Sequence, residues 1–211
     1  MIKNILFDMG GVIFDQDTDQ ALERFRAVGV DTDKYLGKYE QQGCFLDLEI
    51  GRIGEEEFCE KMAEIAGRDH ISLNEAARCW QGFHKSTPLY KLHALEELRK
   101  NYHLGLLSNT NPFMMAFTDS KAFSEEGKPI SDYFDSLFLS CEMKLYKPSK
   151  DIYLEVLRRD GMKPEETLFV DDSKRNIEGA ESVGIHGLYV PTNTDWRPLL
   201  AAKLEELNSD K

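Results

Sequence analysis

Four short polar motifs, each beside an apolar run, hold the residues of this 211-residue chain that could do chemistry. They are Asp8 in ILFDMGGV, Ser108 in LGLLSNTN, Lys147 in MKLYKPSKDIY and the pair Asp171–Asp172 in TLFVDDSKRN. Three of the four follow a run that predicts a buried strand, so they should lie at the carboxyl edge of a sheet, where open α/β folds build their sites. Together they supply a nucleophilic carboxylate, a hydroxyl, a cation and a carboxylate pair. That set suits phosphoryl transfer assisted by a divalent metal.

The carboxylate of Asp8 ends the first predicted strand and is followed closely by Gly10 and Gly11. A carboxylate in this place could attack phosphorus and form an aspartyl-phosphate. The two glycines would let the backbone approach a ligand and present its N–H groups to it. The alternative is that Asp8 caps a turn and that the glycines only tighten it.

The segment LLSNTN ends a second predicted strand with hydroxyl and amide groups. The hydroxyl of Ser108 and the amide of Asn109 could donate hydrogen bonds to phosphate oxygens. The alternative is ordinary turn and helix-capping chemistry, which we favour for Asn111.

A lysine near these groups would reduce the repulsion between an anionic nucleophile and an anionic substrate. Lys147 precedes Pro148, which biases it towards an extended backbone, and a helix follows. Lys144 and Lys150 are the alternatives for this role.

The adjacent carboxylates Asp171 and Asp172 follow the apolar run LFV directly. Two such groups at a buried strand end are costly unless they are paired or bind a metal. With Asp8 they offer the hard oxygen ligands that Mg²⁺ prefers. A helix N-terminus explains one of the two aspartates better than both. Asn176, one turn later, could orient this loop from behind the ligands or lie on the surface.

The pattern of apolar residues predicts an α/β fold, a Rossmann-like parallel sheet with helices on both faces, interrupted by a helical module. Residues 1–17 and 86–211 are expected to form the α/β core, and residues 18–85 a helical insertion of about four helices without a strand. Ser72 and Glu75 have the spacing of a capping box. The core elements expected are strands at Lys3–Asp8, His103–Leu107, Ser136–Leu139, Thr167–Asp171 and Gly187–Val190, and helices at Leu89–Lys100, from Pro112, Lys150–Asp160 and Lys174–Val183.

The bulk composition excludes several classes of protein. The net charge of −12 disfavours nucleic acid, whose binding rests on cations that neutralise phosphates. No apolar run approaches the length of a membrane span, and MIKNILFDMGG lacks the features of a signal peptide. The four cysteines show no zinc spacing and suggest reduced thiols in the cytoplasm.

The motifs FDMGGV, LLSNTN, YKP and FVDDSKRN resemble, in this order, those of the haloacid dehalogenase superfamily over Ile5 to Val190. FDMGGV, LSNTN and FVDDSKRNIEGA look most like the subgroup that includes bacterial glucose-1-phosphate phosphatases. The resemblance implies that the helical insertion is a cap that closes over small substrates. It also implies a set of roles: Asp8 as nucleophile, Ser108 and Lys147 on phosphate, and Asp172, with Asp171 close behind and the carbonyl of Gly10, on Mg²⁺.

The chain departs from the superfamily pattern at two positions. Most phosphatases of the superfamily carry, two residues after the nucleophile, an aspartate that acts as general acid and base, and this chain has Gly10 there. Proton transfer of this kind is worth ~10²–10⁴-fold in rate. Asp15 and Asp17 are close enough in sequence to be considered as substitutes. Lys144 stands where relatives often have glycine, and it either adds charge near the site or points to solvent.

The sequence therefore predicts a Mg²⁺-dependent phosphatase that hydrolyses a small phosphorylated metabolite through an aspartyl-phosphate. A sugar 1-phosphate is a candidate, because an anomeric hydroxyl leaves more easily than an ordinary alcohol. One alternative is a 2-haloacid dehalogenase, which uses the same aspartate on carbon without a metal. Another is a non-catalytic protein that binds a phosphorylated ligand. We expect no nucleic-acid or membrane partner, and a monomer or homodimer.

Overall fold

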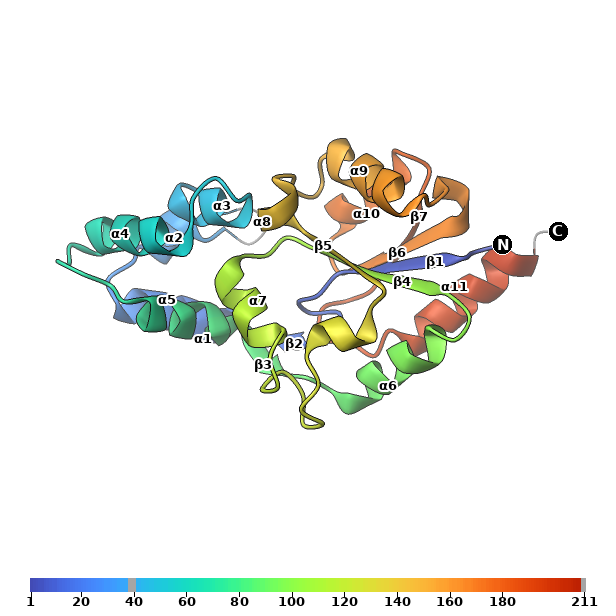
Figure 1. Cartoon of the computed structure of the whole chain (residues 1–211), viewed down its shortest axis with the longest axis horizontal. Coiled ribbons are helices and arrows are strands. Elements are labelled where there is room, and N and C mark those ends of the chain that lie inside the picture. Colours follow the sequence, from blue (N-terminus) through green and yellow to red (C-terminus); the bar gives the residue numbers. More distant parts are fainter. Residues whose placement is uncertain (38–40, 210–211) are drawn as a thin grey trace.

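The protein is built around a five-stranded parallel sheet, as the sequence predicts (Figure 1). The structure, a computed structural model, describes residues 1–37 and 41–209. The strand order is β5-β4-β1-β6-β7. Phe7 at the end of β1 pairs with Leu106 of β4 and with Val170 of β6, so these three strands reach the same edge together. The strands are β1 (Asn4–Phe7), β4 (His103–Ser108), β5 (Ser136–Leu139), β6 (Thr167–Asp171) and β7 (His186–Tyr189).

Helices cover both faces of the sheet, because successive strand residues point to opposite sides. Leu6 packs with residues of α9 (Lys150–Asp160) and α10 (Lys174–Glu181). Its neighbours Ile5 and Phe7 belong to the core that includes residues of α6 (Leu89–Leu98) and α11 (Arg197–Ser209). Figure 1 shows the two helix layers on either side of the strands. Helix α11 is an addition to the elements that the sequence predicts.

Several short elements complete this part of the chain. The predicted helix near Pro112 is present as α7, and its N-cap is Asn111, whose side chain accepts a hydrogen bond from the amide of Met114 as expected. Helices α6 and α10 each end two residues before the predicted boundary, and β7 begins and ends one residue early. The remaining bounds are α7 (Pro112–Thr118), α8 (Ser140–Met143), η2 (Ile130–Tyr133) and η3 (Pro164–Glu166).

The segment between β2 (Asp15–Gln16) and β3 (His84–Ser86) is helical and lies to one side of the sheet (Figure 1). The expectation that residues 18–85 contain no strand is wrong at its end, where β3 pairs antiparallel with β2. Both strands are short and polar, so no apolar alternation marks them. The capping box of Ser72 and Glu75 is confirmed. The helices of this insertion are α1 (Thr18–Ala27), α2 (Thr32–Tyr35), α3 (Cys44–Glu49), α4 (Glu55–Ala66), α5 (Leu73–Trp80) and the single-turn η1 (Gln81–Phe83).

Aromatic rings hold the helical insertion together and join it to the α/β part of the chain. Phe45 lies at the centre, with ring centroids 5.3 Å from Phe25, 5.2 Å from Phe58 and 5.9 Å from Trp80. Phe58 also contacts Phe113 of α7, 5.8 Å away. The apolar core of the insertion is therefore continuous with the core of the α/β part.

A second contact between the two parts is a close backbone approach just after α3. Gly51 has φ +64°, and a Cβ atom added there would lie 1.9 Å from the carbonyl oxygen of Cys141 in α8. Only a glycine satisfies both the left-handed backbone and this contact. The position of α3 over the sheet edge therefore depends on Gly51.

We expect Gly51→Ala to destabilise the protein more than Gly67→Ala does. Both glycines have left-handed backbones, +64° and +63°, but nothing lies within 4 Å of a Cβ at Gly67. Both variants carry the backbone cost of about 1–2 kcal/mol, and overpacking at residue 51 adds about 1–3 kcal/mol. Chemical denaturation measures the difference in the free energy of unfolding. Equal losses in the two variants would contradict this account of the contact.

Candidate functional site

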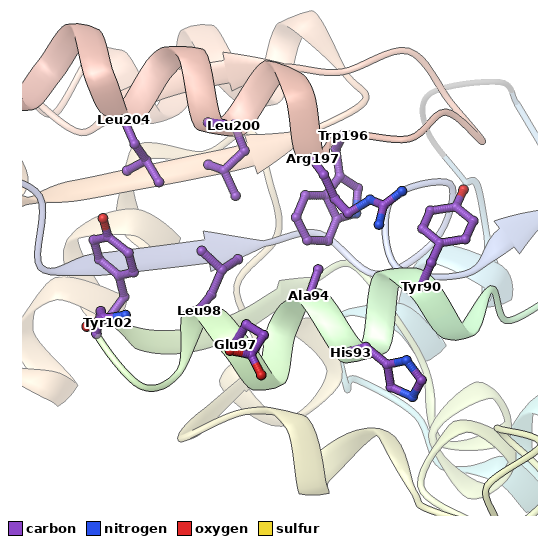
Figure 2. A pocket seen from close by; sticks show the side chains of 12 residues that line it. Tyr90, His93, Ala94, Glu97, Leu98, Tyr102, Trp196, Arg197, Leu200 and Leu204 are labelled. Atoms are coloured by element: carbon purple, nitrogen blue, oxygen red, sulfur yellow. The ribbon is translucent and has the colours of Figure 1, made fainter.

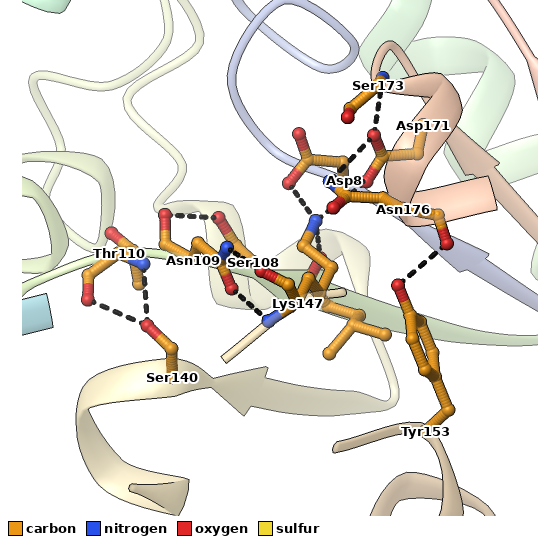
Figure 3. A network of polar contacts seen from close by, with 11 residues as sticks. Asp8, Ser108, Asn109, Thr110, Ser140, Lys147, Tyr153, Asp171, Ser173 and Asn176 are labelled. Carbon is orange, nitrogen blue, oxygen red and sulfur yellow. Dashed lines mark hydrogen bonds and ion pairs between the residues drawn. The ribbon is translucent and has the colours of Figure 1, made fainter. Parts of the chain in front are cut away.

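The centre of the site is the buried ammonium group of Lys147 (Figure 3). Its Nζ lies 2.8 Å from Oδ1 of Asp8 and 2.7 Å from Oδ2 of Asp171, and it donates to the carbonyl oxygen of Leu107 at 3.0 Å. These partners come from the carboxyl ends of β1, β6 and β4. The structure thus brings the other three predicted motifs together around the lysine of the fourth.

The main chain of Lys147 is held by the side chain of Asn109. The Oδ1 atom of Asn109 accepts from the Lys147 amide at 2.9 Å, and its Nδ2 donates to the Lys147 carbonyl at 3.0 Å. The alternative lysines, Lys144 and Lys150, are exposed. Lys144 has φ +57° at the C-cap of α8, a left-handed position that favours glycine. This backbone geometry accounts for the glycine that relatives often have at this position, and it does not explain the lysine of this chain.

Two opposing effects act on the charges of this centre. Burial alone lowers the pKa of Lys147, but attraction by Asp171 and Asp8 outweighs it and raises the pKa. Burial also raises the pKa of Asp171, whereas the ammonium group of Lys147 lowers it. We assign a charged ion pair, because the Asp171 oxygens also accept from the amide of Ser173 at 2.7 Å and from Nδ2 of Asn176 at 3.1 Å. Asn176 therefore orients Asp171, which is the first of the two roles that the sequence left open for it.

Asp172 is in a different situation from its neighbour. Its Oδ2 accepts a hydrogen bond from Thr192 at 2.6 Å, and it faces an open cavity. Burial, followed by the nearby charge of Asp8, raises the pKa of Asp172 to about 6. Oxygens of Asp8, Asp171 and Asp172 lie within 4.8 Å of one another, close enough to share one metal ion. Three carboxylates against one ammonium leave an excess of negative charge that a divalent cation would offset.

The cavity, of about 540 Å³, lies between the edge of the sheet and the helical insertion. The insertion contributes Gln41, Glu49, Trp80 and Phe83 to its wall. Ser108 lines it and is buried, with its Oγ 3.4 Å from the carbonyl oxygen of Asn109. Of the residues predicted for the site, those that line the cavity are Asp8, Gly10, Ser108, Asn109, Lys147, Asp172 and Asn176.

Gly11 lies against the site and does not line the cavity. It has φ +75°, and a Cβ atom there would lie 2.6 Å from Oδ2 of Asp172 and 2.8 Å from Cγ2 of Thr192. Its place in the sequence is therefore explained by close packing against these two side chains. Asp171 also lies behind the cavity wall.

The side chain of Gln16 fills the space next to Gly10, where most phosphatases of the superfamily carry an aspartate. A Cβ atom at Gly10 would lie 3.1 Å from Oε1 of Gln16. The Gln16 backbone is clasped by Asn193, which accepts from its amide at 2.7 Å and donates to its carbonyl at 2.9 Å. The sequence does not single out Gln16, Thr192 or Asn193. Their one sequence feature is that the last two follow the final strand.

Asp15 and Asp17, considered above as substitute acids, do not line the cavity. Asp15 pairs with the buried Lys91, 2.9 Å from its Nζ. Asp17 is the N-cap of α1 and accepts from the amide of Gln20 at 3.0 Å. Both carboxylates are thus engaged in holding the connection between the insertion and the sheet.

A larger hollow, of about 680 Å³, lies between α6 and α11 (Figure 2). Its wall includes Leu98, Trp196 and Leu200, and at one end the guanidinium of Arg197 stacks 4.4 Å from the ring centre of Tyr90. The motifs singled out in the sequence contribute nothing to this wall. The smaller cavity, with the carboxylates and Lys147, is therefore the candidate active site.

Comparison with known proteins agrees with this geometry. The profile of haloacid dehalogenase-like hydrolases matches residues 2–184. The chain belongs to this family. Among curated proteins it is 42% identical to D-ribitol-5-phosphate phosphatase of Bacteroides thetaiotaomicron, over 97% of this chain and 99% of that protein. It is 27% identical to a phosphorylated carbohydrates phosphatase of Thermotoga maritima, over 95% and 91% of the two chains.

Solved structures of family members have the same fold over almost the whole chain. A HAD-like family hydrolase of Porphyromonas gingivalis is 37% identical, with a TM-score of 0.91 over 97% of this chain and 98% of that one. A HAD family enzyme of Bacteroides thetaiotaomicron, solved with magnesium and inorganic phosphate, is 34% identical. Its TM-score is 0.86 over 94% and 99% of the two chains.

No helix formed by residues 1–37 and 41–209 has the length and apolar character needed to cross a membrane. All four cysteines carry free thiols.

Glu49, at the end of α3, is a buried carboxyl group that the sequence did not single out. Its Oε2 accepts a hydrogen bond from the hydroxyl of Tyr146 at 2.9 Å. Burial raises the pKa of Glu49 from its ordinary 4.5 to about 7, against the smaller lowering effect of this hydrogen bond. The folded protein therefore keeps the Glu49 carboxyl protonated at pH values where the unfolded chain has lost the proton.

We expect Glu49→Gln to remove part of the pH dependence of stability. Between pH 4.5 and 7 the unfolded chain has lost the proton that the folded protein keeps, so the wild type loses stability as pH rises through this window. The full cost, reached above pH 7, is up to about 3 kcal/mol. Denaturation measured at about pH 5 and about pH 8 should show that the free energy of unfolding of the variant, relative to the wild type, is greater at the higher pH.

Asp47→Asn is the matched control, because Asp47 lies in the same helix and pairs with Arg52 at the surface. Its stability should follow that of the wild type across the same pH range. Curves for Glu49→Gln that run parallel to the wild type would contradict the raised pKa.

Proposed function

We propose that this hydrolase is a Mg²⁺-dependent phosphatase of small phosphorylated sugars or polyols, with Asp8 as its nucleophile. The observation that carries the proposal is the contact between Asp8 and the buried ammonium of Lys147, next to Asp172 on the wall of one cavity. The relatives named as phosphatases of D-ribitol 5-phosphate and of phosphorylated carbohydrates support the substrate class.

The donor set fits a magnesium ion. Asp8, Asp172 and the carbonyl of Gly10 would hold it, with Asp171 behind them, because hard oxygen ligands suit Mg²⁺. The ion would offset negative charge and align the phosphate group.

The residues of the chain account for both halves of the reaction. A carboxylate oxygen of Asp8 attacks phosphorus, the bond from phosphorus to the alcohol oxygen breaks, and the alcohol leaves after taking up a proton. Lys147 reduces the repulsion between Asp8 and the phosphate, while Ser108 and the amide of Asn109 donate to phosphate oxygens. Water then attacks phosphorus, releases inorganic phosphate and restores the Asp8 carboxylate.

Gly10 gives this mechanism no acid at the usual position. The neighbouring carboxamide of Gln16 is neutral and can only hydrogen-bond, so it can orient an oxygen but cannot protonate it. We propose water as the proton carrier for the leaving alcohol.

We also propose that residues 18–85 act as a cap domain on an α/β core of residues 1–17 and 86–211. The support is a cavity whose wall comes from both parts of the chain, which suits a small enclosed substrate and not a macromolecule. The membership of the glucose-1-phosphate phosphatase subgroup stays a prediction, as does a monomer or homodimer without nucleic-acid or membrane partners. Four free thiols favour the cytoplasm as the proposed compartment.

The two alternative functions receive less support. A 2-haloacid dehalogenase needs no metal, so it leaves the group of Asp8, Asp171 and Asp172 unexplained. A non-catalytic binding protein has no need for the pair of Asp8 and Lys147, which is buried at a cost.

We expect phosphate release from a panel of sugar and polyol phosphates to require Mg²⁺ and to stop when EDTA is added. Asp8→Asn should lower kcat by roughly 10³-fold or more, because the nucleophile is lost. Unchanged thermal unfolding of the variant would show that the fold is kept. Phosphate release that survives EDTA or the Asp8→Asn change would contradict the proposal, and so would no release from any substrate of the panel.

We expect Thr192→Val to lower the affinity of the enzyme for Mg²⁺. The change keeps the shape of the side chain but removes the 2.6 Å hydrogen bond that orients Asp172, and such losses typically cost about 10–100-fold in metal affinity. Titration of phosphate release with Mg²⁺ measures the effect. Thr194→Val is the control, because Thr194 donates to the Pro191 carbonyl in the same loop and does not touch Asp172. Equal Mg²⁺ curves for the two variants would refute this role of Thr192.

A further inference from the structure

The carboxylate of Glu49 lies in an unusual place for a buried acidic group. It is 6% exposed, it comes from the helical insertion, and it lines the same cavity as Asp8. Asp8 and Asp172 line this cavity too, and both belong to the proposed metal site. Glu49 is thus a carboxylate that the helical insertion, and not a strand end, contributes to this cavity.

The backbone of Glu49 is tied to the loop that follows β4. Its carbonyl accepts from the hydroxyl of Ser140 at 2.6 Å. The same hydroxyl accepts from the amide of Thr110 at 2.9 Å and contacts the Thr110 carbonyl at 3.1 Å (Figure 3). Thr110 lies two residues after Ser108, so one buried hydroxyl links Glu49 to the loop proposed to bind phosphate.

One carboxylate oxygen of Glu49 accepts a hydrogen bond, whereas the other has none from the residues that the structure describes. Tyr146, the residue before Lys147, donates its hydroxyl to Oε2 at 2.9 Å. Among residues 1–37 and 41–209 the structure gives Oε1 no hydrogen-bond or ion-pair partner. A carboxylate has about four acceptor positions, so this group has capacity for a ligand.

Residues that line the same cavity carry further buried polar atoms that lack partners among the described residues. Buried side-chain atoms are normally paired, and each exception calls for a reason. Four such atoms belong to residues that line this cavity and have no hydrogen-bond partner in the described part of the chain: Gln41 Oε1, Trp80 Nε1, Thr110 Oγ1 and Asn111 Nδ2. The atoms of Trp80 and Asn111 are donors, that of Gln41 is an acceptor, and the Thr110 hydroxyl can do both. A chain of hydroxyl groups suits this mixture, because each hydroxyl donates one hydrogen bond and accepts others.

We infer that Glu49, held by Tyr146, accepts a hydrogen bond from a hydroxyl of the leaving group and so selects polyhydroxylated phosphomonoesters. The inference rests on the proposed phosphatase function and assigns its substrate specificity to one side chain. An alkyl leaving group would leave the open acceptor position of Glu49 unsatisfied, which is how polar sites reject analogues without hydroxyls. Tyr146 is a positioning residue, since it acts through Glu49.

The test compares two substrates with the same five-carbon chain, D-ribitol 5-phosphate and pentyl phosphate, in the presence of Mg²⁺. The wild type should prefer ribitol 5-phosphate. Glu49→Met removes the acceptor and keeps the bulk, and should lower kcat/KM for ribitol 5-phosphate by about 10–100-fold. It should leave pentyl phosphate turnover within about threefold. Glu49→Gln keeps a carbonyl acceptor, so its kcat/KM for ribitol 5-phosphate should fall less.

Tyr146→Phe should raise KM for ribitol 5-phosphate with a smaller effect on kcat, because it only loosens Glu49. Asp47→Asn, in the same helix, should leave kcat/KM unchanged for both substrates. Thermal unfolding of each variant reports whether it is folded, independently of its turnover of either substrate.

Three results would overturn the inference. Equal loss on both substrates in a folded Glu49→Gln variant would assign Glu49 to proton transfer. A Glu49→Met variant that keeps the preference of the wild type would show that another group reads the hydroxyls, while the phosphatase function stands. Phosphate release from neither substrate by the wild type would remove the proposed function and the inference with it.

Discussion

The structure of the site depends on one buried cation among three carboxylates. An ammonium group with almost no exposure to water is stable only when it is paired, and Lys147 contacts Asp8 and Asp171 at once. These contacts join the ends of β1 and β6, and the Lys147 backbone is bonded to Asn109 after β4. The charge of the centre remains negative even so. The same arrangement that stabilises Lys147 therefore creates the need for a divalent cation, which makes the metal part of the electrostatic balance of the fold.

The helical insertion and the sheet edge have separate tasks at this cavity. The strand ends supply the charged groups, whereas the insertion supplies Glu49, Trp80 and neutral polar atoms. The two parts share one apolar core and meet at a backbone contact so close that only Gly51 fits. A wall of this kind is positioned by packing, so its hydrogen-bonding groups are held in place before a ligand arrives. Such preorganisation favours a leaving group with matching hydroxyls over one that is merely the right size.

The side chain of Gln16 occupies the space next to Gly10, close to the proposed nucleophile. An acidic side chain at residue 10 would begin against the carboxamide of Gln16, and the backbone of Gln16 is fixed by Asn193. The space next to the nucleophile is thus filled by a group that forms hydrogen bonds but carries no labile proton at neutral pH. The chemistry of the leaving group has to accommodate this feature, and that links the substrate class to the architecture of the loop after β7.

The sequence by itself determined the parallel sheet, the capping box of α5 and the meeting of Asp8, Asn109, Lys147 and Asp171. It could do so because the carboxyl ends of parallel strands converge at one edge, so motifs far apart in sequence become neighbours by topology alone. Tertiary structure decided the roles of Gln16, Glu49, Thr192 and Gly51. It also placed Asp15 and Asp17 outside the site, where each has another partner. A polar residue in a loop or at the end of a short helix has no periodic pattern. Its partners depend on where that segment docks, and docking is a property of the packed core as a whole.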